Sequence, residues 1–543
     1  MYTIDKDAHG NAVRTNVGTG VSERNRDTSK TSSAIGPKSG GSRPRFRAYG
    51  RRHIGQIRQL GRLSRHQLTA LTVASAVMPF RVNDYVLEEL IDWSNIPSDP
   101  IYQLTFPQAE MLDEIDFSRL KTLVMTGAGQ DMIQHCAREI HMRMNPHPAG
   151  QMELNVPTVK GKELPGCQHK YRETVLFFPR AGQTCHAYCT YCFRWPQFVG
   201  VERLKFVTRE IDLLVRYLQG HEEVTDVLVT GGDPLIMTSS MLRKNIEPLL
   251  GEGLDHIASI RIGTKALSYW PYRFTTDRDA DDLLRLFEDV QRSGRHLAVM
   301  AHYSHPRELQ TEAAREALRR MKDTGAVVRC QAPLVRHVND SSDVWADLWR
   351  EEVHLGAVPY YMFVARNTGP RSYFEVPLVR GLQIFSEAFA RVSGLARTVR
   401  GPIMSAAPGK VLVDGITTVN GQKVIVLKMI QGRDPKWANR VFFARFNPRA
   451  TWLDQLEPAF GRREFFFERS LREMAMDEWQ PSWKDKSVPE VGSIHRQSRK
   501  RLTVPMDPRS AGGNESRAMY IQEQVIPDRT LETDHEGNGN SHV

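Results

Sequence analysis

The feature of this sequence that most restricts its fold is a regular alternation of short β-rich runs and helical patterns between residues 173 and 363. The β-rich runs are 174–178, 224–229, 257–262, 296–302, 326–330 and 358–363. The helical patterns between them are 209–218, 241–250, 280–293, 311–324 and 342–355. Parallel strands joined by helices wind right-handedly. The sequence therefore predicts an α/β fold, a partial (β/α)6 barrel.

Three cysteines follow the first predicted strand, at the end of the barrel where the chemistry of such folds is expected. Cys185, Cys189 and Cys192 lie within eight residues, although the whole chain has only six cysteines. Three soft thiolates at this spacing are typical of an iron–sulfur cluster in which one iron is left open. The alternatives are a zinc site completed by His186 and a chance group of buried thiols.

A glycine-rich turn, Gly231, Gly232 and Asp233, follows the second predicted strand. Two glycines let the backbone approach a ligand closely, and a carboxylate accepts a hydrogen bond from a ligand ammonium group. By itself the turn also fits a tight connection in which Asp233 caps the next helix. Close to a three-cysteine loop, it favours a small-molecule site at the open iron.

These motifs resemble the signature of radical S-adenosylmethionine (SAM) enzymes, and seven runs in order resemble the lysine 2,3-aminomutase family. The runs are 185–194, 231–235, 260–264, 302–306, 338–340, 359–361 and 407–410. The resemblance covers residues 164–414 and implies a partial barrel of the radical SAM type. It also implies an isomerase that converts an L-α-amino acid into a β-amino acid with a [4Fe–4S] cluster, SAM and pyridoxal 5′-phosphate (PLP) as cofactors.

The resemblance implies roles for individual residues. The three cysteines would hold the cluster, and the cofactors would contact Gly231, Gly232, Asp233, His302, Gln331, Lys170, Tyr171 and Lys410. PLP is expected as a Schiff base on Lys410, which follows Gly409 in a loop after the barrel. Its phosphate is expected near Lys170 and Tyr171, with Arg172 as a second cation because relatives carry an arginine at the place of Lys170.

The substrate pocket departs from that of lysine-using relatives. Arg194 matches the arginine that pairs with the substrate α-carboxylate. Two aspartates hold the distant ammonium group of lysine in those relatives, but Arg366 and Ala406 stand here instead. A lysine side chain would meet a like charge, so the resemblance predicts glutamate or a neutral amino acid as substrate. In the neutral alternative, Arg366 faces solvent or pairs with Glu375.

Two other function classes remain open at this stage. One is a radical SAM enzyme on the same scaffold with a different substrate, such as a lysine on a protein. The other is a non-catalytic iron–sulfur or nucleic-acid-binding protein that uses the arginine-rich stretch 43–65, which contributes much of the net charge of +10. That stretch has no recognisable nucleic-acid-binding fold, so a solvated basic segment is favoured. The expected partners are an amino acid and an electron donor such as flavodoxin or ferredoxin, with a homo-oligomer possible.

Composition divides the chain into five parts. Residues 1–45 and 487–543 are rich in small polar and charged residues and predict disordered tails. Between them we expect a helical region at 46–163, the barrel at 164–400, and at 401–486 the lysine loop with a C-terminal α+β subdomain. No apolar run reaches the roughly 18 residues that span a membrane. With no visible secretory signal and three further single cysteines, these features predict a reduced, cytoplasmic protein.

Overall fold

The computed structural model describes residues 4–6, 12–14, 44–152, 154–159 and 161–476. Of the two predicted tails, this range includes only residues 44 and 45 and the short paired strands β1 (Ile4–Lys6) and β2 (Ala12–Arg14). The rest of both tails lies outside the described residues.

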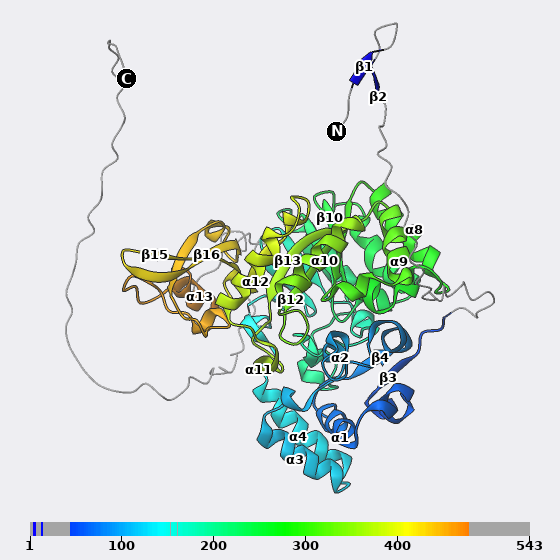
Figure 1. The fold of residues 1–543 in the computed structure, drawn as a ribbon. Helices are drawn as coiled ribbons and strands as arrows, with labels where there is room; N and C mark the ends of the chain where they lie inside the picture. The colour runs from blue at the N-terminus through cyan, green and yellow to red at the C-terminus, as the bar shows by residue number, and fades with distance from the viewer. Residues whose placement is uncertain (1–3, 7–11, 15–43, 153, 160, 477–543) are drawn as a thin grey trace, which may run out of the picture. The chain divides into compact units, whose positions relative to one another are not determined.

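A sheet of eleven strands, β7 to β17, forms the centre of the fold (Figure 1), and its strands are neighbours in chain order. Seven of them run parallel to one another: β8 (Thr174–Phe177), β9 (Asp226–Val229), β10 (Ser259–Thr264), β11 (His296–His302), β12 (Val327–Leu334), β13 (Val358–Val364) and β14 (Arg400–Ser405). The first six confirm the predicted strands. The seventh, β14, was missed because Gly401 and Pro402 weaken the strand pattern.

Antiparallel strands continue the sheet at both edges. These strands are β7 (Cys167–Tyr171) beside β8, and β15 (Gly409–Val419), β16 (Gln422–Gly432) and β17 (Val441–Arg445) beyond β14. In the described residues β7 and β17 are the two edges and do not pair with each other. The sheet is therefore open, and the expectation of six strands is corrected to seven parallel strands within a larger mixed sheet.

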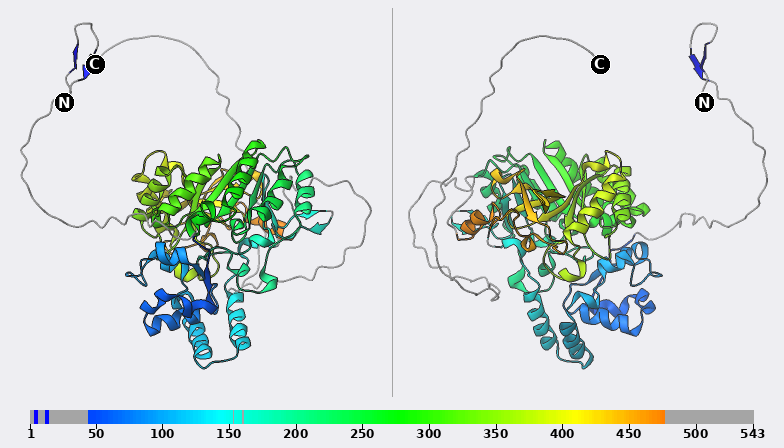
Figure 2. Two further views of the ribbon diagram at one scale, coloured as in Figure 1. Left: turned by 90° about the vertical axis from the view of Figure 1, so that its right-hand side faces the viewer. Right: turned by 60° about the vertical axis from the view of Figure 1, so that its left-hand side comes forward.

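Helices follow the parallel strands and cover one face of the sheet (Figures 1 and 2). They are α5 (Ile211–Gln219), α6 (Ser239–Ile246), α8 (Ala280–Arg292), α9 (Glu312–Asp323), α10 (Ser342–His354) and α12 (Leu378–Ala390). Their apolar residues join those of the strands in one buried cluster. In β12 every second residue is buried in this cluster, as are Ile260 and Ile262 of β10, while the residues between them are half-buried on the other face. That alternation leaves the second face of the sheet available to line a site.

The N-terminal part is not purely helical. Helices α1 (Arg65–Ala74), α3 (Glu114–Met125) and α4 (Gln130–Arg143) share a small apolar core. Strands β3 (Ala48–Gly50) and β4 (Arg81–Asn83) pair, and α2 (Pro100–Thr105) follows them. The side chain of Asn83 donates to the carbonyls of His186 (3.2 Å) and Tyr269 (2.9 Å). This contact ties β4 to the cysteine loop.

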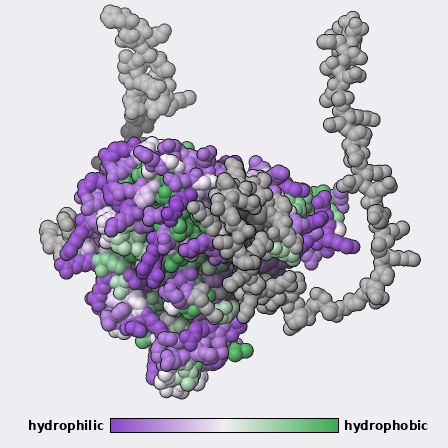
Figure 3. Space-filling view, turned by 180° about the vertical axis from the view of Figure 1, so that it is seen from behind, coloured by the Kyte–Doolittle hydropathy of each residue, from purple (hydrophilic) through white to green (hydrophobic). Residues whose placement is uncertain are grey.

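The C-terminal part has a separate apolar core in which β15, β16 and β17 pack with α13 (Glu468–Ala475). In the part of the chain that the structure describes, no helix has both the length and the apolar character needed to cross a membrane. On the face shown in Figure 3, hydrophilic side chains dominate and hydrophobic ones form small separate patches.

Candidate functional site

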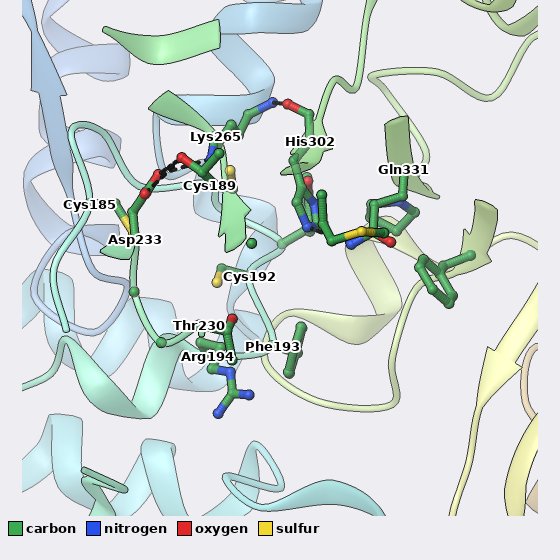
Figure 4. A pocket seen from close by; sticks show the side chains of 18 of the residues that line it. Cys185, Cys189, Cys192, Phe193, Arg194, Thr230, Asp233, Lys265, His302 and Gln331 are labelled. Atoms are coloured by element: carbon green, nitrogen blue, oxygen red, sulfur yellow. Dashed lines mark hydrogen bonds between the residues drawn. The ribbon is translucent and has the colours of Figure 1, made fainter. Parts of the chain in front are cut away.

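A cavity of about 250 Å³ lies at the carboxyl ends of the parallel strands (Figure 4). Each of the seven parallel strands, or the residue directly after it, contributes to its lining, so the sheet curls around it. Ten of the thirteen site residues predicted from the sequence line this cavity: Cys185, Cys189, Cys192, Arg194, Gly231, Gly232, Asp233, His302, Gln331 and Arg366. The other three, Lys170, Tyr171 and Lys410, lie together in a neighbouring group described below.

The cysteine loop is positioned by backbone hydrogen bonds to the N-terminal part. The Tyr188 N–H donates to the Arg81 carbonyl (2.8 Å), and the Thr190 N–H donates to the Leu104 carbonyl (2.9 Å). The thiol of Cys189 lies 3.3 Å from the Tyr269 hydroxyl. The loop is thus held by contacts that do not depend on a bound metal.

In the zinc alternative, His186 would be the fourth ligand. Among the described residues, no group of three or more His, Cys, Asp or Glu side chains is placed to hold a single metal ion. His186 is buried, and burial lowers its pKa to about 3. Its ring packs edge-on against Phe46 at 5.4 Å, so His186 contacts Phe46 rather than completing a zinc site.

The glycine turn packs directly on the segment that leads into the cysteine loop. Gly231 has a φ of +148°, and a Cβ atom there would lie 2.2 Å from the side-chain nitrogen of Gln183. A Cβ atom at Gly232 would lie 2.6 Å from the Thr184 carbonyl oxygen. The Asp233 N–H donates to that same oxygen at 2.8 Å. Gly231 is therefore required by its backbone conformation, and Gly232 by the close approach of the two loops.

Asp233 is a capping residue in this structure. Its carboxylate accepts hydrogen bonds from the Leu235 N–H (3.0 Å), the Thr264 hydroxyl (2.8 Å) and the Lys265 N–H (2.9 Å). Burial raises its pKa to about 6, against the effect of these donors. Asp233 therefore caps the next helix, as the alternative interpretation expected. A contact of Asp233 with a ligand ammonium group stays a prediction.

His302 and Gln331 form a polar pair on the wall of the cavity (Figure 4). The Gln331 amide nitrogen lies 2.9 Å from His302 Nε2. Burial lowers the pKa of His302 to about 3, so the ring is neutral and accepts from the amide. Lys265, a lining residue that sequence reasoning missed, donates to the His302 carbonyl at 3.1 Å and pairs with the buried Glu308. Lys265 could have been predicted from the sequence, because it directly follows the run 260–264, which resembles the lysine 2,3-aminomutase family.

Two arginines give the cavity a positive charge. The Arg194 guanidinium lies 4.0 Å from the centre of the Phe178 ring, and that of Arg366 lies 4.3 Å from the Phe193 ring. Arg366 also donates to the Ser405 hydroxyl at 2.9 Å. Burial lowers the pKa of Arg194 to about 9 and that of Arg366 to about 10. Neither takes part in an ion pair among the described residues.

The structure contradicts one alternative for Arg366 and corrects the expected place of Ala406. Glu375 pairs with Arg371 at 2.8 Å, and Arg366 lines the cavity instead of facing solvent or pairing with Glu375. Ala406 is buried in the C-terminal core and does not line the cavity, because the direction of side chains alternates along the strand. Ser405 is the residue that faces the cavity from this strand end.

The predicted PLP lysine lies next to this cavity in a group of basic residues. We call Lys170, Arg366, Lys410 and Arg433 the cation cluster. Lys410 is the second residue of β15, so it lies on a strand and not in the expected loop. Its ammonium nitrogen donates to the Gln431 side chain (2.8 Å) and lies 5.3 Å from the centre of the Tyr171 ring.

The turn before β15 brings the other cations close. Lys170 donates to the Ala406 carbonyl, and Arg433 donates to the Ala407 carbonyl at 2.7 Å. Burial, with Arg433, Arg366 and Lys410 nearby, holds the pKa of Lys170 well below its usual range. Burial also lowers the pKa of Lys410 to about 7, so a large fraction of its amine is neutral near physiological pH.

Arg172 does not supply the second cation expected for a phosphate. It is exposed and pairs with Glu173 at 3.4 Å. Arg433 occupies the neighbourhood of Lys170 instead, although sequence reasoning missed it. Arg433 lies beyond the segment that carried the resemblance, and only the pairing of β15 with β16 brings it next to Lys410.

Comparisons with known proteins bear on this site. No family model matches the chain. A protein of Aquifex aeolicus named "Putative L-lysine 2,3-aminomutase" is 29% identical over 399 residues, which cover 73% of this chain and 92% of that protein. The L-lysine 2,3-aminomutases of Acetoanaerobium sticklandii and Escherichia coli are 28% and 29% identical over stretches covering 52% and 67% of their length. Over these stretches the chain is similar to proteins named as lysine 2,3-aminomutases.

Members of the lysine 2,3-aminomutase family are isomerases, and their cofactors are a [4Fe–4S] cluster, SAM and PLP. A solved structure, a radical SAM methyltransferase from Sphaerobacter thermophilus, aligns with 52% of this chain and 92% of that chain. Its identity to this chain is 16% and the TM-score is 0.31.

Proposed function

We propose that this protein is a radical SAM, PLP-dependent amino acid 2,3-aminomutase whose substrate is an L-amino acid with a negatively charged side chain. The charge of the cavity carries the proposal. Arg194 and Arg366 line it without an ion pair among the described residues, and the charge of Lys265 is matched by Glu308, whereas Asp233 is the only acid among the described lining residues. We assign Asp233 to the wall of the SAM site, so no other acid among the described lining residues is available to pair with the ammonium group of a lysine substrate.

The residues present fit the cofactors of the family. Cys185, Cys189 and Cys192 would hold the cluster and leave one iron for SAM, in what we take to be a partial barrel of the radical SAM type. The turn at 231–233 and the pair His302–Gln331 would form the walls of the SAM site. When bound, cluster and SAM supply a 5′-deoxyadenosyl radical that removes a hydrogen atom, and PLP supplies the π-system through which the amino group migrates.

Lys410 fits the role of the PLP lysine. Its lowered pKa provides the neutral amine that carbonyl chemistry requires, and the Gln431 side chain orients it. Lys170 and Arg433 lie where they would neutralise a phosphate, and Arg433 has the planar donor set that suits phosphate oxygens.

The two arginines of the cavity fit a substrate with two carboxylates. We assign the α-carboxylate to Arg194 and the side-chain carboxylate to Arg366, which Ser405 holds in position. A lysine ammonium about 5 Å from Arg366 would be repelled by about 3 kcal/mol at an effective dielectric constant of about 20. That energy corresponds to a preference of roughly a hundredfold. A lysine on a protein surface, the alternative considered from the sequence, would meet the same repulsion.

The test of this function starts with protein reconstituted anaerobically with iron, sulfide and PLP. Borohydride reduction followed by peptide mapping should place the PLP adduct on Lys410. The Lys410→Ala variant should lose the adduct and keep its iron, whereas Lys428→Ala, a half-buried lysine on β16, should keep both. Dithionite and SAM should then yield 5′-deoxyadenosine. An adduct on another lysine, or no SAM cleavage, would contradict the proposal.

A further inference from the structure

The arginine-rich N-terminal segment plays no part in the site described above. Residues 44–66, which we call the arginine face, carry seven arginines and no acidic residue. Six of them are exposed: Arg45, Arg47, Arg52, Arg58, Arg62 and Arg65. Along the described chain, the first arginine that takes part in an ion pair is Arg119. The arginine face thus presents charges that no carboxylate of the described residues neutralises directly.

This face lies against the cysteine loop. The Phe46 ring packs edge-on against His186 at 5.4 Å and against Trp270 at 5.0 Å. His186 directly follows Cys185 in the chain. Phe46 is 36% exposed and His186 only 3%. The partly exposed Phe46 ring therefore directly contacts the buried His186, the neighbour of the predicted cluster ligand Cys185.

A groove of about 540 Å³ adjoins this contact. Arg45, Arg47 and Arg58 line it together with Trp270 and Tyr272. Three acids also line this groove, namely Asp84, Glu88 and Glu89. Residues 44–90 as a whole contain eight arginines and these three acids, a net charge of +5. The excess of positive charge identifies the kind of molecule that the surface attracts.

We propose that the arginine face docks a small, acidic, one-electron carrier protein of the flavodoxin or ferredoxin type, which reduces the cluster. The inference rests on the proposed function, because a radical SAM cluster must be reduced by one electron before SAM is cleaved. One electron leaves the carrier, which is oxidised, and enters the cluster, which is reduced. No bond forms or breaks in this step.

Physical arguments favour this partner. Complementary charge accelerates encounter by one to three orders of magnitude and loses its effect at high salt. Electron-transfer encounters use small interfaces, which suits one groove and its rim.

The test uses the full-length reconstituted protein and three variants. Arg45→Glu/Arg47→Glu/Arg58→Glu reverses three positive charges of the groove, and Glu88→Gln/Glu89→Gln neutralises its two exposed acids. Arg462→Glu/Arg463→Glu is the matched control, since these arginines are exposed in the C-terminal part. Cluster reduction is followed by absorbance, with reduced flavodoxin or with dithionite, at low and high salt. Binding of oxidised flavodoxin is measured separately by calorimetry.

The triple variant should lose at least tenfold in the flavodoxin-driven rate at low salt and in flavodoxin affinity. Its dithionite-driven rate should equal that of the unmodified protein. Glu88→Gln/Glu89→Gln should react faster with flavodoxin, and the control should be unchanged. Equal flavodoxin rates and affinities in all proteins would overturn the docking site. So would loss of nucleic-acid binding in the triple variant while its flavodoxin rate is unchanged. A protein that holds no cluster would instead overturn the proposed function.

Discussion

The cavity lined by the cysteines and the cation cluster around Lys410 are built in different ways. Backbone contacts of the loops themselves make the cavity wall, as Gly232 shows by its close approach to Thr184. The cation cluster depends on strands far apart in sequence, because Lys170 lies on β7, Lys410 on β15 and Arg433 directly after β16. The difference teaches that the motifs of the first site are local, whereas the second exists only once the sheet has formed.

Removing one cysteine of the loop should abolish the function of the cavity completely. Cys185→Ala, Cys189→Ala or Cys192→Ala leaves two thiolates, too few for a stable [4Fe–4S] cluster, so iron content and SAM cleavage should fall to background. Cys330→Ala is the control, because Cys330 is buried in the core between sheet and helices. It should retain its iron. Iron retained by a cysteine-loop variant, with normal 5′-deoxyadenosine formation, would reject the cluster assignment.

A methyl group at Gly232 should also damage the cavity side and spare the cation cluster. Its Cβ atom would lie within 2.7 Å of backbone atoms of residues 183 and 184, which cannot move independently of the cysteine loop. We expect Gly232→Ala to destabilise the protein by about 3 kcal/mol and to lower iron incorporation. Gly415→Ala meets no atom within 4 Å and should cost nothing measurable in a urea titration. Equal stability of both variants would argue against the packing described here.

Loss of one charge from the cation cluster should weaken PLP binding and leave the cysteine-lined cavity intact. Lys170→Met or Arg433→Met should weaken PLP binding by roughly tenfold to a hundredfold, since a charge-assisted hydrogen bond is worth about 1.5–3 kcal/mol. Arg172→Met should bind PLP normally, because Arg172 is exposed and paired with Glu173. Equilibrium dialysis measures all three. A greater loss in Arg172→Met than in Lys170→Met would restore the phosphate site expected from the sequence.

The pH dependence of PLP incorporation should distinguish Lys410 from an ordinary lysine. Burial lowers the pKa of Lys410 to about 7, so the neutral amine dominates above that pH and the rate should level off near pH 8. An ordinary lysine would keep gaining rate up to about pH 10. Arg400 also lowers the pKa of Lys410, so Arg400→Gln should move the midpoint upward by a fraction of a unit. A rate that rises steadily to pH 10 would contradict the buried environment.

Sequence reasoning predicted much of the fold because hydrophobic periodicity directly reports the buried strands and helices. All six expected strands are present, and the missed β14 contains Pro402, which removes a backbone donor. Most of the cavity was predictable as well, since its residues follow strand ends in short motifs.

The remaining site residues could not be predicted from the sequence, because their positions depend on how the strands of the sheet pair. Nothing local distinguishes Arg433 from a surface arginine, and the pairing of β15 with β16 alone brings it to Lys410. The orientation of position 406 depended on strand register in the same way, because a shift of one residue exchanges Ser405 and Ala406 between cavity and core.

Substrate choice tests the central claim most directly. The reconstituted protein with dithionite, SAM and PLP would receive glutamate, aspartate, lysine and the neutral amino acids at equal concentration, and mass spectrometry would quantify the β-amino isomers. The positive cavity of Arg194 and Arg366 predicts that the β-isomer of an acidic amino acid exceeds β-lysine by roughly a hundredfold. Efficient formation of β-lysine, or of a neutral β-amino acid only, would contradict the account of the cavity.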